Sequence, residues 1–161
     1  MTCDILIRSY YKDLDWLHYA LRSIRRHCRG FSRVVLVVPH SSRERLHWLG
    51  LAGDTIWSSP DYRDDYLGQQ VSKLSADLYT DAEFVCHIDS DCMFYRDTTP
   101  ADLFVQGKPR VLMTPYARLD PHVPWKGITE QFLGIPVEFE FMRTPPYVFP
   151  ALRKNLTRAA F

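Results

Sequence analysis

Three short apolar runs constrain the fold of this chain more than any other feature of its sequence. They are the residues ILI at 5–7, VVLVVP at 34–39 and FVCHID at 84–89. A strand whose consecutive residues are apolar is usually covered on both faces, as in the middle of a parallel sheet. Helical patterns and short loops separate the runs. This alternation predicts a parallel sheet with helices on both of its faces.

The first half of the chain continues this alternation up to residue 91. We expect Asp13 to cap the first helix, and Ser41 or Ser42 to cap the second. The expected elements are strands at 3–10, 33–39, 54–59 and 83–91, with helices at 13–28, 41–50 and 66–80 between them.

The regular alternation of strands and helices ends after residue 91. The expected elements there are a one-turn helix at 98–104 capped by Thr98 or Thr99, a fifth strand at 109–115, a proline-bearing loop at 116–128, a short helix ending at Gly134, an alternating strand at 137–143 and a terminal helix at 150–161. We therefore predict an α/β fold, a Rossmann-like three-layer α/β/α sandwich whose mostly parallel central sheet is joined by a small antiparallel C-terminal part.

Length and charge limit the function classes. A chain of 161 residues can form one domain with a real core but is too short to expect two, so we predict a single domain over 1–161. Its 20 Lys and Arg against 19 Asp and Glu give a net charge of +1. This balance predicts no nucleic-acid partner and no attraction to an anionic membrane.

Cysteine spacing and the N-terminal residues bear on localisation. Cys3, Cys28, Cys86 and Cys92 form no C-x-x-C pair, and we expect reduced, mostly buried thiols. That pattern favours a cytoplasmic protein. The start MTCDILIRSY predicts a strand rather than a signal peptide, and no apolar run approaches the length of a membrane span.

Two D-x-D strings occur, and their positions distinguish them. Asp13-Leu14-Asp15 starts an amphipathic helix, where acidic residues cap amides and favour the helix dipole, so we interpret it as structural. Asp89-Ser90-Asp91 ends an apolar strand. Residues i and i+2 of an extended segment point the same way and can share one hard cation such as Mg²⁺ or Mn²⁺. The alternative is a strand-end turn built from turn-forming residues.

The helix before this strand carries a lysine. Gln70, Lys73 and Asp77 form a polar stripe next to an apolar face made of Leu67, Val71, Leu74 and Leu78. From that stripe Lys73 could reach over the strand ends towards a phosphate. The alternative is a solvated surface lysine.

The stretch VSKLSADLYTDAEFVCHIDSDCMF resembles the GT-A class of nucleotide-sugar glycosyltransferases. In glycogenin-like members of that class, a helix carrying Lys-Leu precedes a strand that ends in D-x-D, as Lys73-Leu74 precedes Asp89 here. The resemblance covers about residues 4 to 114 and implies a donor half at 1–114 and a partial acceptor half at 115–161.

The resemblance implies a nucleotide-diphosphate sugar donor at the edge of the sheet. Asp89 and Asp91 would bind Mn²⁺ or Mg²⁺, with Asp89 also able to hold the ribose, and Lys73 would contact a phosphate or the sugar. The remaining donor contacts implied are Arg8, Ser9, Tyr10 and Lys12 just after the first strand, together with Gln70 and Ser90. Tyr10 or Tyr11 could stack on the base, or pack beside the buried strand instead.

The second half is expected to bind a carbohydrate or other hydroxyl acceptor. Trp125 could offer a platform for a sugar ring, or anchor a loop to the core. Among the glutamates, Glu140, with Glu138 and Glu130 as alternatives, would be the base of an inverting enzyme. Arg143 pairing with one of them is the structural alternative. The related enzymes usually have more chain beyond this point, often with a further metal ligand such as a histidine near the C-terminus. The last histidine here is His122, so the third metal ligand is His122 or absent. A homo-oligomer or a partner chain would then complete the acceptor site.

Other readings remain open. A phosphatase with an aspartyl nucleophile usually carries its D-x-D after the first strand, whereas three strands are expected before Asp89. A nucleotidyltransferase of similar fold would show a glycine-rich loop after the first strand, and RSYYKD at 8–13 contains no glycine. The main alternative is a non-catalytic or truncated nucleotide-binding remnant of the GT-A fold.

Overall fold

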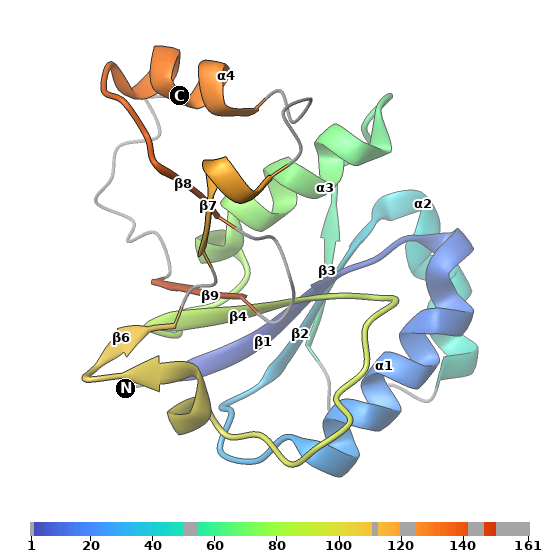
Figure 1. The fold of residues 1–161 in the computed structure, drawn as a ribbon. Coiled ribbons are helices and arrows are strands. Elements are labelled where there is room, and N and C mark those ends of the chain that lie inside the picture. Colours follow the sequence, from blue (N-terminus) through green and yellow to red (C-terminus); the bar gives the residue numbers. More distant parts are fainter. Residues whose placement is uncertain (1, 50–54, 111–112, 120–124, 142–146, 151–161) are drawn as a thin grey trace.

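A five-stranded sheet forms the centre of the molecule (Figure 1). The computed structural model describes residues 2–49, 55–110, 113–119, 125–141 and 147–150. The α-helices and strands are β1 (Cys3–Arg8), α1 (Leu14–His27), β2 (Val34–Pro39), α2 (His40–Arg43), β3 (Thr55–Ser59), α3 (Asp65–Leu74), β4 (Phe84–Asp89), β5 (Phe104–Val105), β6 (Lys108–Pro109), β7 (Met113–Pro115), α4 (Trp125–Leu133), β8 (Phe139–Phe141) and β9 (Tyr147–Pro150).

The order of the strands confirms the predicted fold class. The sheet runs β3-β2-β1-β4-β9, in which β1 to β4 are parallel and β9 is antiparallel to β4. The chain moves outward from β1 to β3 and then returns to place β4 on the other side of β1. In open α/β sheets, ligands bind at the carboxyl ends of the strands where the order reverses in this way. That position lies here between the ends of β1 and β4.

Alternating residues of β1 divide the core into two layers. Ile5 and Ile7 pack in the cluster that contains the buried leucines of α1, whereas Leu6 packs on the other face with Ala76 and Tyr79. Both faces of the sheet are therefore covered, as a three-layer sandwich requires. Among the helices of the described residues, none combines the length and apolar character of a membrane span.

Helix α3 does not contact the sheet through the apolar face that its sequence predicts to be buried. Its buried residues are Gly68 and Ser72, which are small and let the backbone approach the sheet. The apolar face is exposed, with relative accessibilities of 57% for Leu67, 41% for Val71, 65% for Leu74 and 50% for Leu78. The polar stripe of Gln70, Lys73 and Asp77 is half-buried instead.

The second half departs most from expectation. The described residues of 109–115 form no fifth parallel strand: Lys108–Pro109 pairs with β5, and Met113–Pro115 pairs with β8 in a separate sheet. Prolines lack the N–H that a central strand must donate, which explains why this segment stays outside the main sheet. The fifth strand is β9, so Pro150 is not the start of a helix, and residues 151–161 lie outside the described part. Residues 125–128, expected in a loop, begin α4.

Helix ends match the sequence in part. Of the two predicted caps, Thr99 is the one used: it forms a capping box with Asp102. Gly134 follows α4 with a φ of 68°. Asp13 occupies the N-cap position of α1 but forms no side-chain capping bond there. The predicted caps Ser41 and Ser42 are wrong, because α2 begins at His40, so both serines lie inside the helix. All four cysteines are free; Cys3 and Cys86 are buried, and Cys28 and Cys92 are half-buried.

Candidate functional site

The D-x-D residues lie at the end of β4. Asp89 is the last residue of the strand and is half-buried, Ser90 is buried, and Asp91 is exposed. A turn follows, closed by a hydrogen bond of 3.1 Å from the Cys92 amide to the Asp89 carbonyl. This turn holds one ligand atom each of Asp89, Asp91 and Cys92 within 4.8 Å of one another. Two carboxylates suit a hard divalent cation, and a thiol adds a softer ligand.

Lys73 reaches the same strand end from α3. Its Nζ lies 2.5 Å from Oδ1 of Asp89, and only 13% of its side chain is exposed. The structure therefore places Lys73 over the end of β4, as the helical spacing suggested, with Asp89 as its partner. A cation and the lysine would share this carboxylate.

Asp13, interpreted from the sequence as a structural residue, also lies beside the D-x-D residues of β4. The Ser90 hydroxyl donates to Oδ2 of Asp13 over 3.4 Å. Burial raises the pKa of Asp13, the Ser90 hydroxyl lowers it, and the nearby carboxylates of Asp91 and Asp65 raise it further. The Asp13-Leu14-Asp15 string thus contributes one aspartate to the same group of negative charges.

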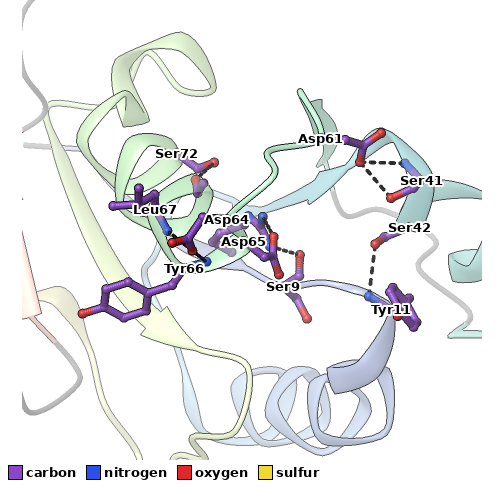
Figure 2. Close-up of polar contacts among 12 residues, drawn as sticks. Ser9, Tyr11, Ser41, Ser42, Asp61, Asp64, Asp65, Tyr66, Leu67 and Ser72 are labelled. Carbon is purple, nitrogen blue, oxygen red and sulfur yellow. Dashed lines mark hydrogen bonds and ion pairs between the residues drawn. The ribbon is translucent and has the colours of Figure 1, made fainter.

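Arg8 and Asp65 form an ion pair behind this group. The Arg8 side chain is 2% exposed; its Nη2 lies 2.7 Å from Oδ1 of Asp65, and its Nη1 donates to the Ser9 carbonyl over 2.7 Å. Figure 2 shows Ser9 and Asp65 facing each other between β1 and α3, with Tyr66 pointing away. The Arg8 guanidinium has little surface left for a ligand, so we expect it to act through Asp65.

A cavity of about 230 Å³ opens beside Asp65, at the ends of β1 and β2. In Figure 2 its wall is held by two contacts: the Tyr11 amide donates to the Ser42 hydroxyl over 3.1 Å, and Asp61 accepts from Ser41. The residues lining the cavity are Tyr10, Tyr11, Lys12, Pro39, Ser41, Ser42, Asp61, Tyr62 and Asp65.

Three buried polar atoms that lack hydrogen-bond partners in the described part of the chain lie at this edge of the sheet, and another, Oδ1 of Asp4, lies near the opposite end of β1. Among the described residues, Arg8 Nε, Ser9 Oγ and Ser59 Oγ are buried and have no hydrogen-bond partner. Arg8 and Ser9 end β1, and Ser59 ends β3 beside Pro39, which lines the cavity. Buried polar groups are nearly always hydrogen-bonded, so these three atoms are exceptions at the same edge as the cavity.

The proposed acceptor residues form a separate group around α4. The Tyr116 hydroxyl hydrogen-bonds Glu140, and this bond raises the pKa of Tyr116. Glu130 accepts from the Val137 amide over 3.1 Å, and Trp125 is 47% exposed at the start of α4. Glu138 is exposed and Gln70 half-buried. His122 and Arg143 lie outside the described residues, so the structure describes neither a third metal ligand at His122 nor an Arg143 pair.

Sequence reasoning missed Asp13 as a site residue, and also Asp61, Tyr62 and Asp65. Each follows the carboxyl end of a parallel strand: Asp13 after β1, and the other three after β3. Position after a strand was therefore the available signal. It was used for Asp89 but not for residues 61–65, because the exposed loop there showed no paired motif.

Comparison with known proteins supports the fold. No protein-family model matches the sequence, and no curated protein matches it. The crystal structure of 4-diphosphocytidyl-2C-methyl-D-erythritol synthase matches with a TM-score of 0.54 at 17% identity, over 94% of this chain and 76% of that one. A crystal structure of S. aureus TarS matches with a TM-score of 0.39 at 16% identity, over 56% of this chain and 28% of that one. This chain therefore spans less than a third of the TarS chain, and the synthase match carries the fold assignment.

Proposed function

We propose that this chain is a metal-dependent glycosyltransferase that binds a nucleotide-diphosphate sugar at the carboxyl ends of β1, β2 and β4. The observation that carries the proposal is the position of Asp89, Asp91 and Lys73 at one strand end, beside a cavity lined by three tyrosines. The cytoplasm is its expected location, because the four cysteines are free.

The residues at the strand end fit a divalent cation. Asp89 and Asp91 would hold Mn²⁺ or Mg²⁺, with Cys92 as a neighbouring thiol. Two carboxylates are sufficient, because these cations keep several waters and are completed by substrate phosphates. When bound, the cation would stabilise the negative charge that develops on the diphosphate leaving group.

The remaining roles belong to side chains of the chain itself. Lys73 would donate to a phosphate oxygen and so stabilise the same leaving charge. Ser9, Tyr10, Gln70 and Ser90 are proposed donor contacts, and Arg8 would position Asp65. In the acceptor half, Trp125 would contact the acceptor, and Glu140 would take the proton of its hydroxyl if the reaction inverts. Tyr116 holds Glu140 in place but also competes for its lone pairs.

A nucleotidyl-transfer reaction is the second candidate. The synthase with the matching fold is named for a product that carries a diphosphocytidyl group. Against this candidate, the segment after β1, RSYYKD, has no glycine to let backbone amides approach a triphosphate. A non-catalytic nucleotide-binding protein is the third candidate.

Thermal-shift measurements test the proposal. UDP, GDP, CDP, dTDP and their sugars are added with Mn²⁺ or with EDTA; a ligand at 100 times its Kd should add about 2.7 kcal/mol to stability. A shift that needs Mn²⁺ and is lost in Asp91→Asn supports the donor site. Asp91 is exposed, so the variant should fold normally. Release of the nucleoside diphosphate with transfer of the sugar to a hydroxyl acceptor identifies the glycosyltransferase. Pyrophosphate release from a nucleoside triphosphate identifies the nucleotidyl-transfer reaction, and binding without turnover identifies the non-catalytic protein.

A further inference from the structure

The cavity beside Asp65 lies where a nucleoside would extend from the strand end. Asp65 belongs both to the cavity wall and to the group of charges that includes Asp13 and Asp91. Asp61 lines the same cavity and is held by Ser41 of α2. A diphosphate at Asp91 would therefore lead its ribose past Asp65 and its base towards Asp61.

The cavity has the size and lining for one nucleobase. Its volume is about 230 Å³, and Tyr10, Tyr11 and Tyr62 supply aromatic surface. Pockets for drug-sized ligands span roughly 300–1,000 Å³, so this one suits a single ring system. Stacking on tyrosines is tolerant of base identity and cannot by itself select one base. Selection must come from polar groups at the wall.

One carboxylate oxygen of Asp61 already accepts hydrogen bonds from Ser41, and the other can accept one from a ligand. Its Oδ1 accepts from the Ser41 amide at 3.2 Å and from the Ser41 hydroxyl at 2.7 Å. These two bonds lower the pKa of Asp61, so the group is a carboxylate at neutral pH. Among the residues that the structure describes, no donor reaches Oδ2. A carboxylate accepts hydrogen bonds and donates none.

We propose that Asp61 selects a nucleobase that carries an exocyclic amino group, namely guanine, cytosine or adenine, over uracil or thymine. The inference rests on the proposed nucleotide-binding function. An amino group would donate to Oδ2, and a hydrogen bond to a charged acceptor is stronger than one between neutral groups. Uracil and thymine carry carbonyl oxygens in place of the amino group. Their one ring donor, N3–H, lies between two carbonyl oxygens that the carboxylate repels, so it is a poorer partner for Oδ2 than an amino group.

Calorimetric titration of free GDP, CDP, ADP, UDP and dTDP in the presence of Mn²⁺ tests the selection. We expect the best amino-bearing base to bind about 10-fold more tightly than UDP or dTDP, the scale of one hydrogen bond to a charged group. In Asp61→Asn the side-chain oxygen can still accept from Ser41, while the new amide can donate to a carbonyl. The preference should then shrink to within about 3-fold, because Asn offers both a donor and an acceptor.

Asp64→Asn is the matched control. Asp64 lies three positions away, does not line the cavity, and caps α3 by accepting from the amides of Tyr66 and Leu67. Asn caps helices as well as Asp does, so this variant removes the same charge without altering the cavity wall. Its base preference should equal that of the wild type.

The outcomes separate the inference from the function on which it rests. Tightest binding of UDP or dTDP by the wild type, or an unchanged preference in Asp61→Asn, overturns the role of Asp61 and leaves the donor site standing. If no diphosphate binds with or without Mn²⁺, the proposed function fails and the inference fails with it.

Discussion

Arg8 and Asp89 are register partners on the adjacent parallel strands β1 and β4, and each forms an ion pair with α3. Arg8 pairs with Asp65, the first residue of the helix, and Asp89 pairs with Lys73, the residue before its last. The helix is thus fixed to the sheet edge at both ends by charged side chains, whereas its apolar face is exposed. Substitutions at this edge should therefore alter ligand binding more than they alter the core.

Replacing Lys73 should affect cation binding and nucleotide binding in opposite directions. Lys73→Met keeps the apolar stem but removes the charge that pairs with Asp89. Because a partly exposed ion pair is worth up to about 1 kcal/mol, Mn²⁺ alone should bind up to about 5-fold more tightly. A nucleoside diphosphate should bind about 10-fold more weakly, because one charged hydrogen bond to a phosphate is lost. Titrations with Mn²⁺ and then with the diphosphate measure both effects.

A conservative variant makes this test specific. Lys73→Arg keeps the positive charge, so cation affinity should stay near the wild-type value. A fall of Mn²⁺ affinity in Lys73→Met would contradict competition between Lys73 and the cation for Asp89.

Replacing Asp13 tests whether this residue belongs to the site or only to the helix end. Burial and the neighbouring carboxylates raise its pKa, so ionising Asp13 costs more free energy in the folded protein than in the unfolded chain. By linkage, its contribution to stability is present at low pH and is lost as the pH rises through the raised pKa. Asp13→Asn should therefore raise the melting temperature of the cation-free protein at pH 7 and weaken Mn²⁺ binding.

The opposite result has a clear meaning. Loss of a capping side chain costs about 0.5–2 kcal/mol of stability. Because Asn caps a helix as well as Asp does, Asp13→Asn would not show this loss, whereas Asp13→Ala would. A lower melting temperature in Asp13→Ala with unchanged Mn²⁺ affinity would return Asp13 to a purely structural role.

Gly68→Ala should displace Tyr62, a side chain that lines the cavity. A Cβ at this position would lie 2.7 Å from Cδ2 and 3.0 Å from Cβ of Tyr62, so Tyr62 must move as a whole. Alanine gains up to about 1 kcal/mol over glycine inside a helix, while overpacking costs about 1–3 kcal/mol. We expect lower stability in urea unfolding together with weaker nucleotide binding, because Tyr62 lines the cavity.

Gly127→Ala is the matched control for this substitution. Gly127 also lies in a helix, α4, and an added Cβ there meets no atom within 4 Å. It should raise stability by up to about 1 kcal/mol through helix propensity alone. Equal effects of the two substitutions would mean that Tyr62 adapts without cost.

Because His87 is buried, we expect the folded protein to lose stability in mild acid. It is 5% exposed in β4, and its pKa is lowered to about 4, mainly by burial and also by the Lys73 charge, with the Asp89 carboxylate opposing both. An unfolded histidine titrates at about 6.5, so the unfolded chain binds the proton first. The stability is present above about pH 6.5 and falls as the pH drops towards about 4, by roughly 3 kcal/mol in total.

Urea unfolding between pH 4 and 8 checks this expectation. His87→Gln should flatten the curve between about pH 6.5 and 4, the window in which the wild type loses stability. His18→Gln, at an exposed position of α1, serves as the histidine control. A wild-type curve that is already flat in this window would show that His87 does not control it.

The parallel sheet was predictable because burial on both faces leaves a direct mark on sequence. Val35 to Val38 form a continuous apolar run, and in the structure each is completely buried in β2. The second half was less predictable, because its strands have only two to four residues and their pairing is decided by tertiary contacts. The expectation that the apolar stripe of α3 would be buried was also wrong. Periodicity predicts that residues share one face of a helix, but it does not show what that face contacts.

The candidate site was predictable only where one sequence motif contained it. Asp89 and Asp91 stand two residues apart on a strand, and Lys73 is set by helical spacing, so all three could be identified. Asp13 and Asp61 reach the site through the order of the strands. That order brings the loop after β1 next to β4, and the loop after β3 next to β2.

The two ion pairs of α3 have a thermodynamic consequence. One end of the helix lines the cavity through Asp65, and the other pairs with Asp89, a proposed cation ligand, through Lys73. A short helix moves as a unit, so a ligand that shifts one end changes the free energy of the other. Such coupling is reciprocal: whatever factor the cation adds to nucleotide affinity, the nucleotide must add to cation affinity. The two would then load cooperatively, and α3 would be the element that carries the cooperativity.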